Sequence, residues 1–400
     1  MSTIRVDTIV DSSGSGPVDF ETIGSLKLGA DGLVLNDSAG AAPHVHKMID
    51  SSGAPFPSAD SGAYNGLMWY DSANERINVW VPVGWRTFGA TKVVQATPFI
   101  MGGDRAIMHI GWDANANDYS TSRMEYYNLD TYTSANYFGT LNTIDYKYVG
   151  SAWDPNSYGL FAGGRYDATY ALYNYVRWKA IATTGNAASF GSLDTLRNNL
   201  QGVSDTTRAV FCGGGSGTNG NTANNQMQYY TISTSGTTTD FGDLTATNNY
   251  LGCNGIMDGT YGLIFNGNNT NIDYITIQTT ANATSFGSTP DSRNNMSGGF
   301  DGSRGILGGG PPISSAYTTY YVEIQTPANA TNFGDLNNCG NGARGGQNNG
   351  TIANFAGGYD GSDRVTSIDS FTVQTPGNAT SFGNLTVKSQ YGAACSGSSS

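Results

Sequence analysis

Three stretches of this sequence combine aromatic rings with carboxylate or guanidinium groups, a combination suited to binding carbohydrate. A sugar can stack its C–H face on an aromatic ring while neighbouring polar groups exchange hydrogen bonds with its hydroxyls. The candidate binding residues are Trp112, Asp113, Tyr119, Arg165, Tyr166, Asp167, Tyr170, Tyr359, Asp360 and Arg364. The alternative interpretation is that Trp112 and the tyrosines only pack their loops onto a scaffold.

Two pairs of carboxylates are close enough in sequence to suggest glycoside cleavage, Asp360 with Asp363 and Asp113 with Asp118. Glycoside hydrolases act through such a pair. Acidic residues at this spacing are also frequent in solvated turns, and no Ser-His-Asp set accompanies them. We therefore expect a binding protein without catalytic residues rather than an enzyme.

The segment His44-Val45-His46 is the one pattern that suggests a metal ion. Alternate residues of a strand share a face, so a three-fold assembly would bring six imidazoles around one ion. Two ordinary surface histidines are the alternative. No other cofactor is expected.

A repeated scaffold must position these side chains, because seven Phe-Gly pairs recur along the chain. The phenylalanines are Phe88, Phe138, Phe190, Phe241, Phe286, Phe333 and Phe382, at intervals of 50, 52, 51, 45, 47 and 49 residues. Periods of this length are typical of propeller blades made of four short strands. The chain is therefore predicted to be an all-β array.

Two apolar segments in each repeat predict strands, and a turn rich in Thr, Asn and Pro follows the second. The first segment closes on glycines, as in 160–164 and 210–214, and we place its first copy at 99–103. The second carries aromatic residues, as in 272–277 and 320–324. In this order the repeat resembles the kelch family of β-propellers, over about residues 95–400.

Counting the double glycines predicts six blades. The first repeat is too short for four strands, whereas residues 390–395 at the C-terminus match the innermost strands of other repeats. We expect a six-bladed kelch-like propeller, residues 91–400, whose C-terminal strand completes the first blade and removes exposed sheet edges.

Variation in length is concentrated after the second strand of each repeat, and function usually occupies variable loops on a rigid scaffold. The longest such loop is expected at 104–122, where it includes His109 and Trp112. The connection from the third strand to the fourth has a constant length in all six blades.

The first 90 residues lack the repeat and are expected to form an extended attachment region, 1–60, and a small tryptophan-containing β-hairpin module, 61–90. The opening, residues 3–17, resembles the N-terminal attachment segments of bacteriophage tail fibres, particularly those of cyanophages. Residues 66–71 and 76–86 resemble a β-hairpin element of phage fibre and appendage proteins.

The resemblance implies a virion appendage protein, a tail fibre, that binds other virion proteins through residues 1–60. Its distal propeller would bind a glycan or another receptor on the host cell surface, and a homotrimer is favoured. A structural virion component is the alternative, such as a head fibre, a decoration protein or a baseplate or tail assembly protein, whose propeller contacts other virion proteins.

Charge and composition exclude some classes of binding partner. A net charge of −12 with only 19 basic residues argues against nucleic acid. No apolar run is long enough for membrane insertion, and the opening residues lack the pattern of a signal peptide, so synthesis in the host cytoplasm is expected. The four cysteines fall in different repeats and are interpreted as small apolar residues.

Overall fold

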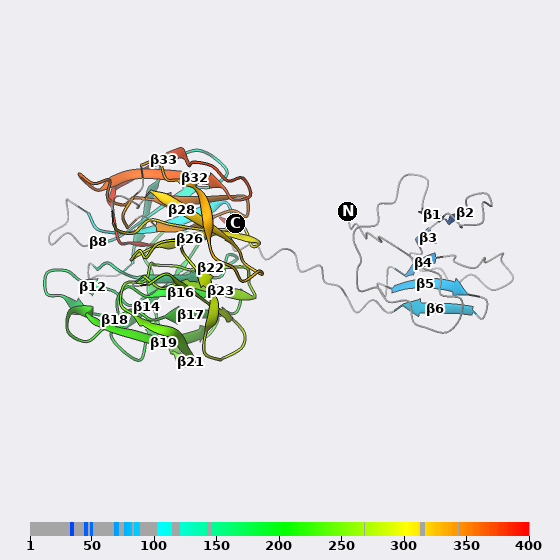
Figure 1. Cartoon of the computed structure of the whole chain (residues 1–400), viewed down its shortest axis with the longest axis horizontal. Coiled ribbons are helices and arrows are strands. Elements are labelled where there is room, and N and C mark those ends of the chain that lie inside the picture. Colours follow the sequence, from blue (N-terminus) through cyan, green and yellow to red (C-terminus); the bar gives the residue numbers. More distant parts are fainter. Residues whose placement is uncertain are drawn as a thin grey trace. The chain divides into compact units, whose positions relative to one another are not determined.

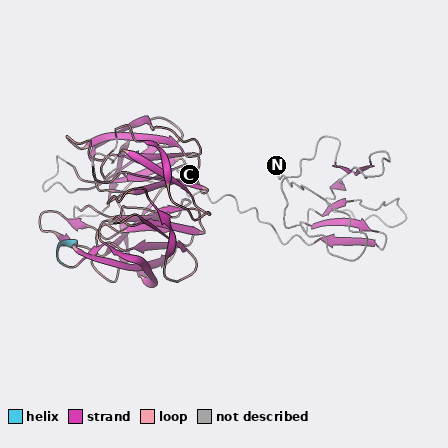
Figure 2. Cartoon of the chain, viewed as in Figure 1, coloured by secondary structure: helices cyan, strands magenta, loops and turns pink. Residues whose placement is uncertain are grey.

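The computed structural model describes residues 102–399 except 114–120, 142–145, 268, 313–316, 339 and 343, together with the backbone of six short strands between residues 33 and 88. The chain divides into two compact units, Met1–Ala96 and Thr97–Ser400. Nearly all regular structure in the described residues is strand (Figure 2).

The first unit contains a two-stranded and a four-stranded sheet. Strands β1 (Leu33–Leu35) and β2 (His44–His46) are antiparallel. The second sheet has the order β3 (Ile49–Asp50), β4 (Met68–Asp71), β5 (Arg76–Val81) and β6 (Gly84–Phe88). Strands β4, β5 and β6 form an antiparallel meander. Phe88, the first of the seven repeated phenylalanines, therefore belongs to this sheet and not to a blade.

The second unit is a six-bladed β-propeller (Figure 1). Blade 1 contains β34 (Ala393–Gly397), β7 (Arg105–Gly111), β8 (Thr121–Asn128) and β9 (Asn136–Thr140). Blade 2 contains β10 (Gly150–Trp153), β11 (Tyr158–Ala162), β14 (Tyr175–Ala180) and β15 (Ala188–Ser192). Blade 3 contains β16 (Gln201–Ser204), β17 (Arg208–Cys212), β19 (Thr222–Thr231) and β21 (Thr239–Asn248).

Blade 4 contains β22 (Ile256–Met257), β23 (Tyr261–Phe265), β24 (Asn271–Thr276) and β25 (Thr284–Ser288). Blade 5 contains β26 (Ser297–Phe300), β27 (Arg304–Gly308), β28 (Thr318–Glu323) and β29 (Thr331–Asp335). Blade 6 contains β30 (Arg344–Asn348), β31 (Ile352–Ala356), β32 (Val365–Thr372) and β33 (Thr380–Ser389).

Five short elements lie beside the main strands of blades 2 and 3. Strands β12 (Arg165–Tyr166) and β13 (Ala171–Leu172) pair with each other after β11. Strand β18 (Gly215–Ser216) pairs with β19, and the 3-10 turn η3 (Thr218–Gly220) follows it. Strand β20 (Gly236–Thr237) lies parallel to β15 of the preceding blade.

The ring is closed as predicted, because the C-terminal strand β34 is the innermost strand of blade 1. It pairs with β7 in antiparallel register from Ala393 opposite His109 to Gly397 opposite Arg105. Each innermost strand also contacts the innermost strands of its two neighbours all the way round. In Figure 1 the cyan first blade consequently lies beside the orange-red last blade.

The axis of the propeller is filled by the innermost strands. The ring of Trp153 in blade 2 stacks on Phe300 in blade 5, with centroids 5.9 Å apart, and both side chains are fully buried. The Ser151 hydroxyl donates to the Ala394 carbonyl at 2.7 Å. These contacts join blades that are distant in sequence.

One strand of the predicted pattern is displaced. The second strand of blade 1 is β7 (Arg105–Gly111), which begins after the Gly102-Gly103 pair instead of ending there. The expected loop at 104–122 therefore contains β7, and His109 is a buried strand residue whose Nε2 lies 2.9 Å from the Thr121 carbonyl oxygen. A buried polar residue inside the apolar run hid this strand from the pattern.

The repeated Phe-Gly pair is explained by contact between blades. In each blade the Phe is buried, from Phe138 to Phe382. The Gly that follows lies against the third-to-fourth-strand turn of the next blade, so a Cβ on Gly334 would sit 2.0 Å from the Gly377 carbonyl oxygen. The buried ring and the close approach at the glycine together set the distance between neighbouring blades.

Side chains of the same turns add bonds between neighbouring blades. Asn282 Oδ1 accepts from the Asp243 backbone N–H at 3.0 Å, and equivalent bonds are made by Asn186, Asn329 and Asn378. This role accounts for the Asn-Ala-Thr turns of the sequence. Gln325 Nε2 donates to Asp258 Oδ2 at 2.7 Å, a pairing repeated by Gln278 with Asp205 and by Gln374 with Asp301.

Candidate functional site

The antiparallel order of each blade separates two ends of the propeller. The connections between first and second strands, and between third and fourth strands, lie at one end, which we call the turn face. The connections between second and third strands, and those from the outermost strand to the next blade, lie at the other, which we call the loop face. The register Gly150 opposite Ala162 shows this, because the start of β10 lies beside the end of β11.

Two tyrosines meet at the inner edge of the loop face, where β10 and β34 begin. The rings of Tyr148 and Tyr391 are 4.8 Å apart and inclined by 34°. Their backbones are joined as well, since the Tyr148 N–H donates to the Tyr391 carbonyl at 2.9 Å. The pair therefore links blade 2 to the closing strand of blade 1.

Both tyrosines have a left-handed backbone conformation, with φ of 63° at Tyr148 and 59° at Tyr391. The equivalent positions of blades 3, 5 and 6 carry Asn199, Asn295 and Gly342, also at positive φ, whereas blade 4 has Tyr250 there without a positive φ. Asn and Gly adopt this conformation readily, whereas a bulky aromatic residue rarely does. Blades 1 and 2 thus depart from the repeat at the two positions where their tyrosines meet.

Positive charges surround these rings. Lys147 Nζ lies 5.3 Å from the Tyr148 centroid and 6.0 Å from the Tyr391 centroid, and the Arg165 guanidinium lies 4.9 Å from that of Tyr148. Asp167 joins the two cations, at 2.7 Å from Lys147 and 3.0 Å from Arg165. The ion pairs hold the charges against the faces of the rings.

Burial and the ion pairs change the pKa values of both Lys147 and Asp167. Burial lowers the pKa of Lys147 and outweighs the opposing hydrogen bond and charge of Asp167, while the charges of Arg165 and Arg364 lower it further. For Asp167, burial alone would raise the pKa, but the hydrogen bonds and charges of Lys147 and Arg165 outweigh burial and lower it. Asp167 therefore stays ionised at neutral pH.

A third group extends the cluster toward blade 6. The Arg364 guanidinium lies 4.2 Å from the Trp112 ring and 5.4 Å from the Tyr359 ring. Its Nε donates to Gln390 Oε1 at 3.0 Å, and Gln390 is the neighbour of Tyr391 in sequence. Blades 6, 1 and 2 are in this way connected across the loop face.

The structure brings together six of the predicted residues. Trp112, Tyr359 and Arg364 form one group, while Arg165, Asp167 and Tyr170 form another, with the Arg165 guanidinium 5.0 Å from the Tyr170 ring. The sequence reasoning missed the residues that lie between these groups, which are Lys147, Tyr148, Gln390 and Tyr391. Aligning the starts of the innermost strands would have found both tyrosines, because blades 3, 5 and 6 carry Asn or Gly there.

Trp112 is less open than the other members of these groups, and the remaining predicted residues lie outside them. Trp112 and Asp113 are buried, so the Trp112 ring serves as a support for Arg364 rather than as an open surface. Tyr166 is half-buried, and Asp360 lies in an exposed turn. Tyr119 and Asp118 lie outside the described residues, as do the side chains of His44 and His46, although the backbone of these histidines forms β2.

The acidic pair Asp360 and Asp363 forms a turn. Asp360 Oδ1 accepts from the backbone N–H groups of Ser362 and Asp363, each at 2.8 Å, and Asp363 pairs with Lys388. The backbone N–H of Asp363 lowers the pKa of Asp360, and the Lys388 hydrogen bond lowers the pKa of Asp363. A glycosidase acid needs the opposite shift, so this pair lacks the electrostatics of that chemistry.

The fold and this cluster define the class of the second unit, a six-bladed β-propeller with an aromatic and cationic loop face. The sequence matches no family model and no curated protein at a significant level. Within the described residues no group of three metal-ligating side chains is found, and no helix is long and apolar enough to cross a bilayer.

Proposed function

We propose that this chain is a bacteriophage virion appendage, a tail-fibre protein, whose kelch-like propeller binds a glycan on the host cell surface through its loop face. The virion assignment and the kelch-like description rest on the resemblances in the sequence. In this proposal residues 1–60 bind other virion proteins, and a trimer raises the avidity of weak sugar contacts.

One observation carries the location of the binding site: tyrosines occupy left-handed positions at 148 and 391, where blades 3, 5 and 6 use Asn or Gly. A bulky residue in this conformation is strained by about 1–3 kcal/mol, and such strain concentrates at functional sites. Tyrosine rings backed by cations are rigid platforms that suit the C–H face of a sugar.

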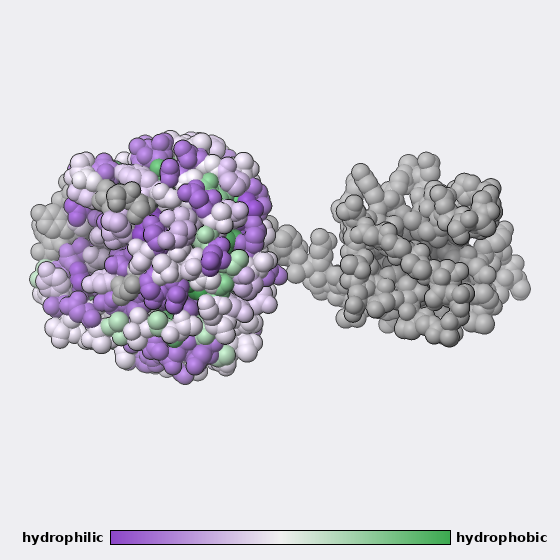
Figure 3. Space-filling model, viewed as in Figure 1, coloured by the Kyte–Doolittle hydropathy of each residue, from purple (hydrophilic) through white to green (hydrophobic). Residues whose placement is uncertain are grey.

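Charge and surface composition agree with a polar ligand. Three cations, Lys147, Arg165 and Arg364, gather on a chain whose net charge is −12. The propeller surface drawn in Figure 3 is mainly polar, with small separate apolar spots. A broad apolar patch would instead favour a permanent protein partner. Binding without cleavage is proposed, because the carboxylates of Asp360 and Asp363 are held in an exposed turn by backbone N–H groups and by Lys388.

The test replaces both tyrosines by the residue that the repeat prefers, as Tyr148→Asn with Tyr391→Asn. Asn relieves backbone strain while ring packing is lost, so the melting temperature should change by only a few degrees. Adsorption of phage carrying the double variant to host cells should fall by at least tenfold. The matched control is Tyr137→Ser, which removes an exposed tyrosine, 5.0 Å from Arg123, on an outermost strand.

Normal adsorption by a folded double variant would overturn the location of the site. If purified full-length protein also failed to bind host cells or their isolated polysaccharides, the receptor-binding function itself would be wrong. Electron microscopy of labelled particles would then show whether the propeller lies against other virion proteins, as a structural component requires.

A further inference from the structure

A depression lies beside this cluster, where the loop faces of blades 2 and 3 meet. Its volume is about 600 Å³, within the range typical of small-ligand sites. The lining residues are Tyr170, Leu172, Thr195, Leu196, Ser216, Gly217 and Thr218. They come from three separate connections, so the depression exists only in the folded propeller.

The lining combines apolar and hydroxyl groups but contains no carboxylate and no cation. Tyr170 and Leu196 are each 50% exposed, and Leu196 is the one large aliphatic side chain with such exposure among the residues that the structure describes. The Thr195 hydroxyl donates to Asp194 at 3.0 Å and that of Ser216 to the Thr222 carbonyl at 3.3 Å. Both oxygens can still accept hydrogen bonds from a ligand.

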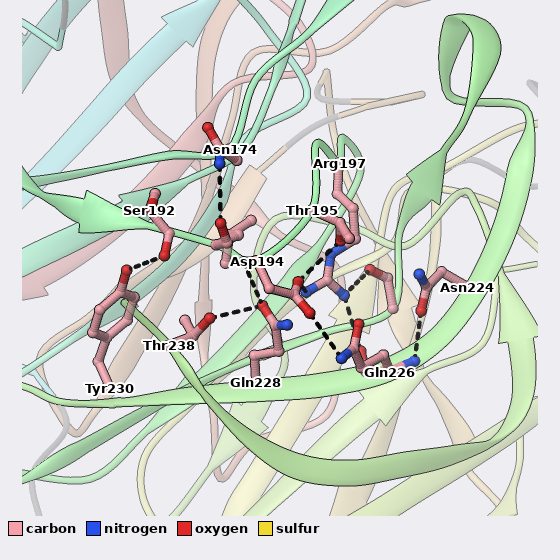
Figure 4. A network of polar contacts seen from close by, with 12 residues as sticks. Asn174, Ser192, Asp194, Thr195, Arg197, Asn224, Gln226, Gln228, Tyr230 and Thr238 are labelled. Atoms are coloured by element: carbon pink, nitrogen blue, oxygen red, sulfur yellow. Dashed lines mark hydrogen bonds and ion pairs between the residues drawn. The ribbon is translucent and has the colours of Figure 1, made fainter. Parts of the chain in front are cut away.

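A buried arginine makes the wall rigid. Arg197 is fully buried, and its Nη1 donates to the carbonyls of Gly213 at 3.2 Å and Gln226 at 3.0 Å. Figure 4 shows its guanidinium between Asp194 and Gln226, with Asp194 Oδ1 3.6 Å from Nη2. One side chain thus fixes the loop that carries Ser216 to the connection that carries Leu196.

The opposite wall is also held in place. Tyr170 has a positive φ of 56°, and the Arg165 guanidinium lies 5.0 Å from its ring. Arg165 is itself held by Asp167 and donates to the Asn219 carbonyl at 3.4 Å. A preorganised wall loses little conformational entropy when a ligand binds.

Blade 5 provides an internal comparison. Arg293 repeats the role of Arg197, since its Nη1 donates to the carbonyls of Thr318 at 2.7 Å and Gly309 at 3.5 Å. The residue before this arginine is Ser292, where the other has Leu196. The exposed leucine is therefore not required by the repeat.

We propose that this depression is a subsite for a neutral sugar that carries a methyl group, either a 6-deoxyhexose or an N-acetylhexosamine. The sugar ring lies on Tyr170, and its methyl group packs against Leu172 and Leu196. The hydroxyls of Thr195, Ser216 and Thr218 exchange hydrogen bonds with the sugar hydroxyls. The inference rests on the proposed glycan-binding function and names the class of sugar.

The experiment titrates the full-length protein with monosaccharides that differ by one group, using saturation-transfer NMR and calorimetry. L-rhamnose is compared with L-mannose and L-fucose with L-galactose for the 6-deoxy source, and N-acetylglucosamine with N-formylglucosamine for the N-acetyl source. One source should bind roughly tenfold more tightly than its methyl-free partner, the discrimination expected for one methyl in an apolar pocket. Equal binding within all three pairs would overturn the proposal.

Leu196→Ser introduces the residue that blade 5 has at the equivalent position, Ser292, and should abolish the preference for methyl-bearing sugars. The matched control is Ser292→Leu in blade 5, which should leave that preference unchanged. An unaltered preference in a folded Leu196→Ser protein would overturn the subsite. A change in molar mass by light scattering, without any change in sugar binding, would also overturn it and indicate a second copy as the occupant.

The two proposals fail separately. Loss of adsorption in the Tyr148 and Tyr391 double variant, with wild-type binding by Leu196→Ser, would retain the receptor function and reject the subsite. Retained adsorption by the double variant, together with methyl-selective binding at Leu196, would reject the tyrosine pair and retain the subsite.

Discussion

The two ends of the propeller use the same strands in different ways. On the turn face the same bonds recur between successive blades, such as Asp258 with Gln325 and Asp243 with Asn282. On the loop face the contact of Tyr148 with Tyr391 and that of Arg364 with Trp112 occur once each. Repeated chemistry indicates a role in holding blades together, whereas chemistry that breaks the repeat indicates a role that the fold does not demand.

We expect the turn face to contribute mainly to stability and the loop face to carry the proposed binding. Substitutions at repeated positions should therefore lower stability without a selective effect on binding. Substitutions at the exceptional positions should do the reverse, except where a buried charge pair is involved.

The largest effect is expected from loss of ring closure. Deleting residues 391–400 removes β34 and leaves β7 as an exposed inner edge, so we expect cooperative thermal unfolding to be lost. Deleting only 398–400 removes two backbone N–H donors, those of Ser398 to Pro155 and of Ser399 to Asp104, and should lower the melting temperature slightly. Equal melting of the two truncations would contradict the importance of closure.

The next effect concerns the glycine of the Phe-Gly pair. Gly334 and Gly377 have nearly the same φ, 156° and 158°, but a new Cβ would clash with the neighbouring blade only at Gly334. Gly377→Ala should cost about 1–3 kcal/mol from backbone strain. Gly334→Ala should cost about 1–3 kcal/mol more from the clash, measured by denaturant unfolding. Equal costs would show that backbone conformation alone selects glycine.

An intermediate effect is expected at the ion pair of the loop face. Asp167→Asn leaves Lys147, whose side chain is only 7% exposed, without its carboxylate and should destabilise the protein by about 2–3 kcal/mol at pH 7. A quarter of the Asp167 side chain is exposed, which keeps this cost below that of a fully buried pair.

The stability cost of Asp167→Asn should depend on pH. The pKa of Asp167 is lowered in the native protein from its usual value of 3.8, so its stabilisation is complete above that pH and disappears as the pH falls through the native value. The difference between wild type and Asp167→Asn, measured by urea unfolding, should therefore shrink below about pH 4. A constant difference down to pH 2 would exclude the ion pair as its cause.

The smallest effect is expected at a single bond of the turn face. Gln325→Leu removes the donor to Asp258 and should cost about 1 kcal/mol, the usual net value of one hydrogen bond. Sugar binding should stay at the wild-type level. Reduced binding in this variant would break the division of roles between the two faces.

The fold could be predicted well from the sequence because its signals are local and repeated. Phe138 and its counterparts mark each outermost strand, and the residue pattern at 390–395 marked the closing strand correctly. The second strand of blade 1 was placed wrongly, since buried His109 interrupts its apolar run and the expected double glycine lies before it. The pair at Phe88 was counted with the repeat although it belongs to a separate sheet.

The candidate site was predicted only in part. Residues such as Arg165 and Tyr359 were found because they lie in variable loops. Tyr148 and Tyr391 were missed because 243 positions separate them in sequence, and only ring closure brings them into contact. Trp112 is likewise buried and has Arg364 of another blade over its ring. The functional role of the cluster and the metal hypothesis at His44 and His46 stay predictions.

The sequence alone determined the all-β class, the six blades and most of their strands, because most strands and turns follow from the types of adjacent residues. Only the tertiary structure decided which side chains share the loop face, which rings have cations at their sides, and where a depression opens. The shared face, the ring–cation contacts and the depression all depend on contacts between blades. Such contacts form only when the C-terminal strand β34 pairs with β7 and closes the ring.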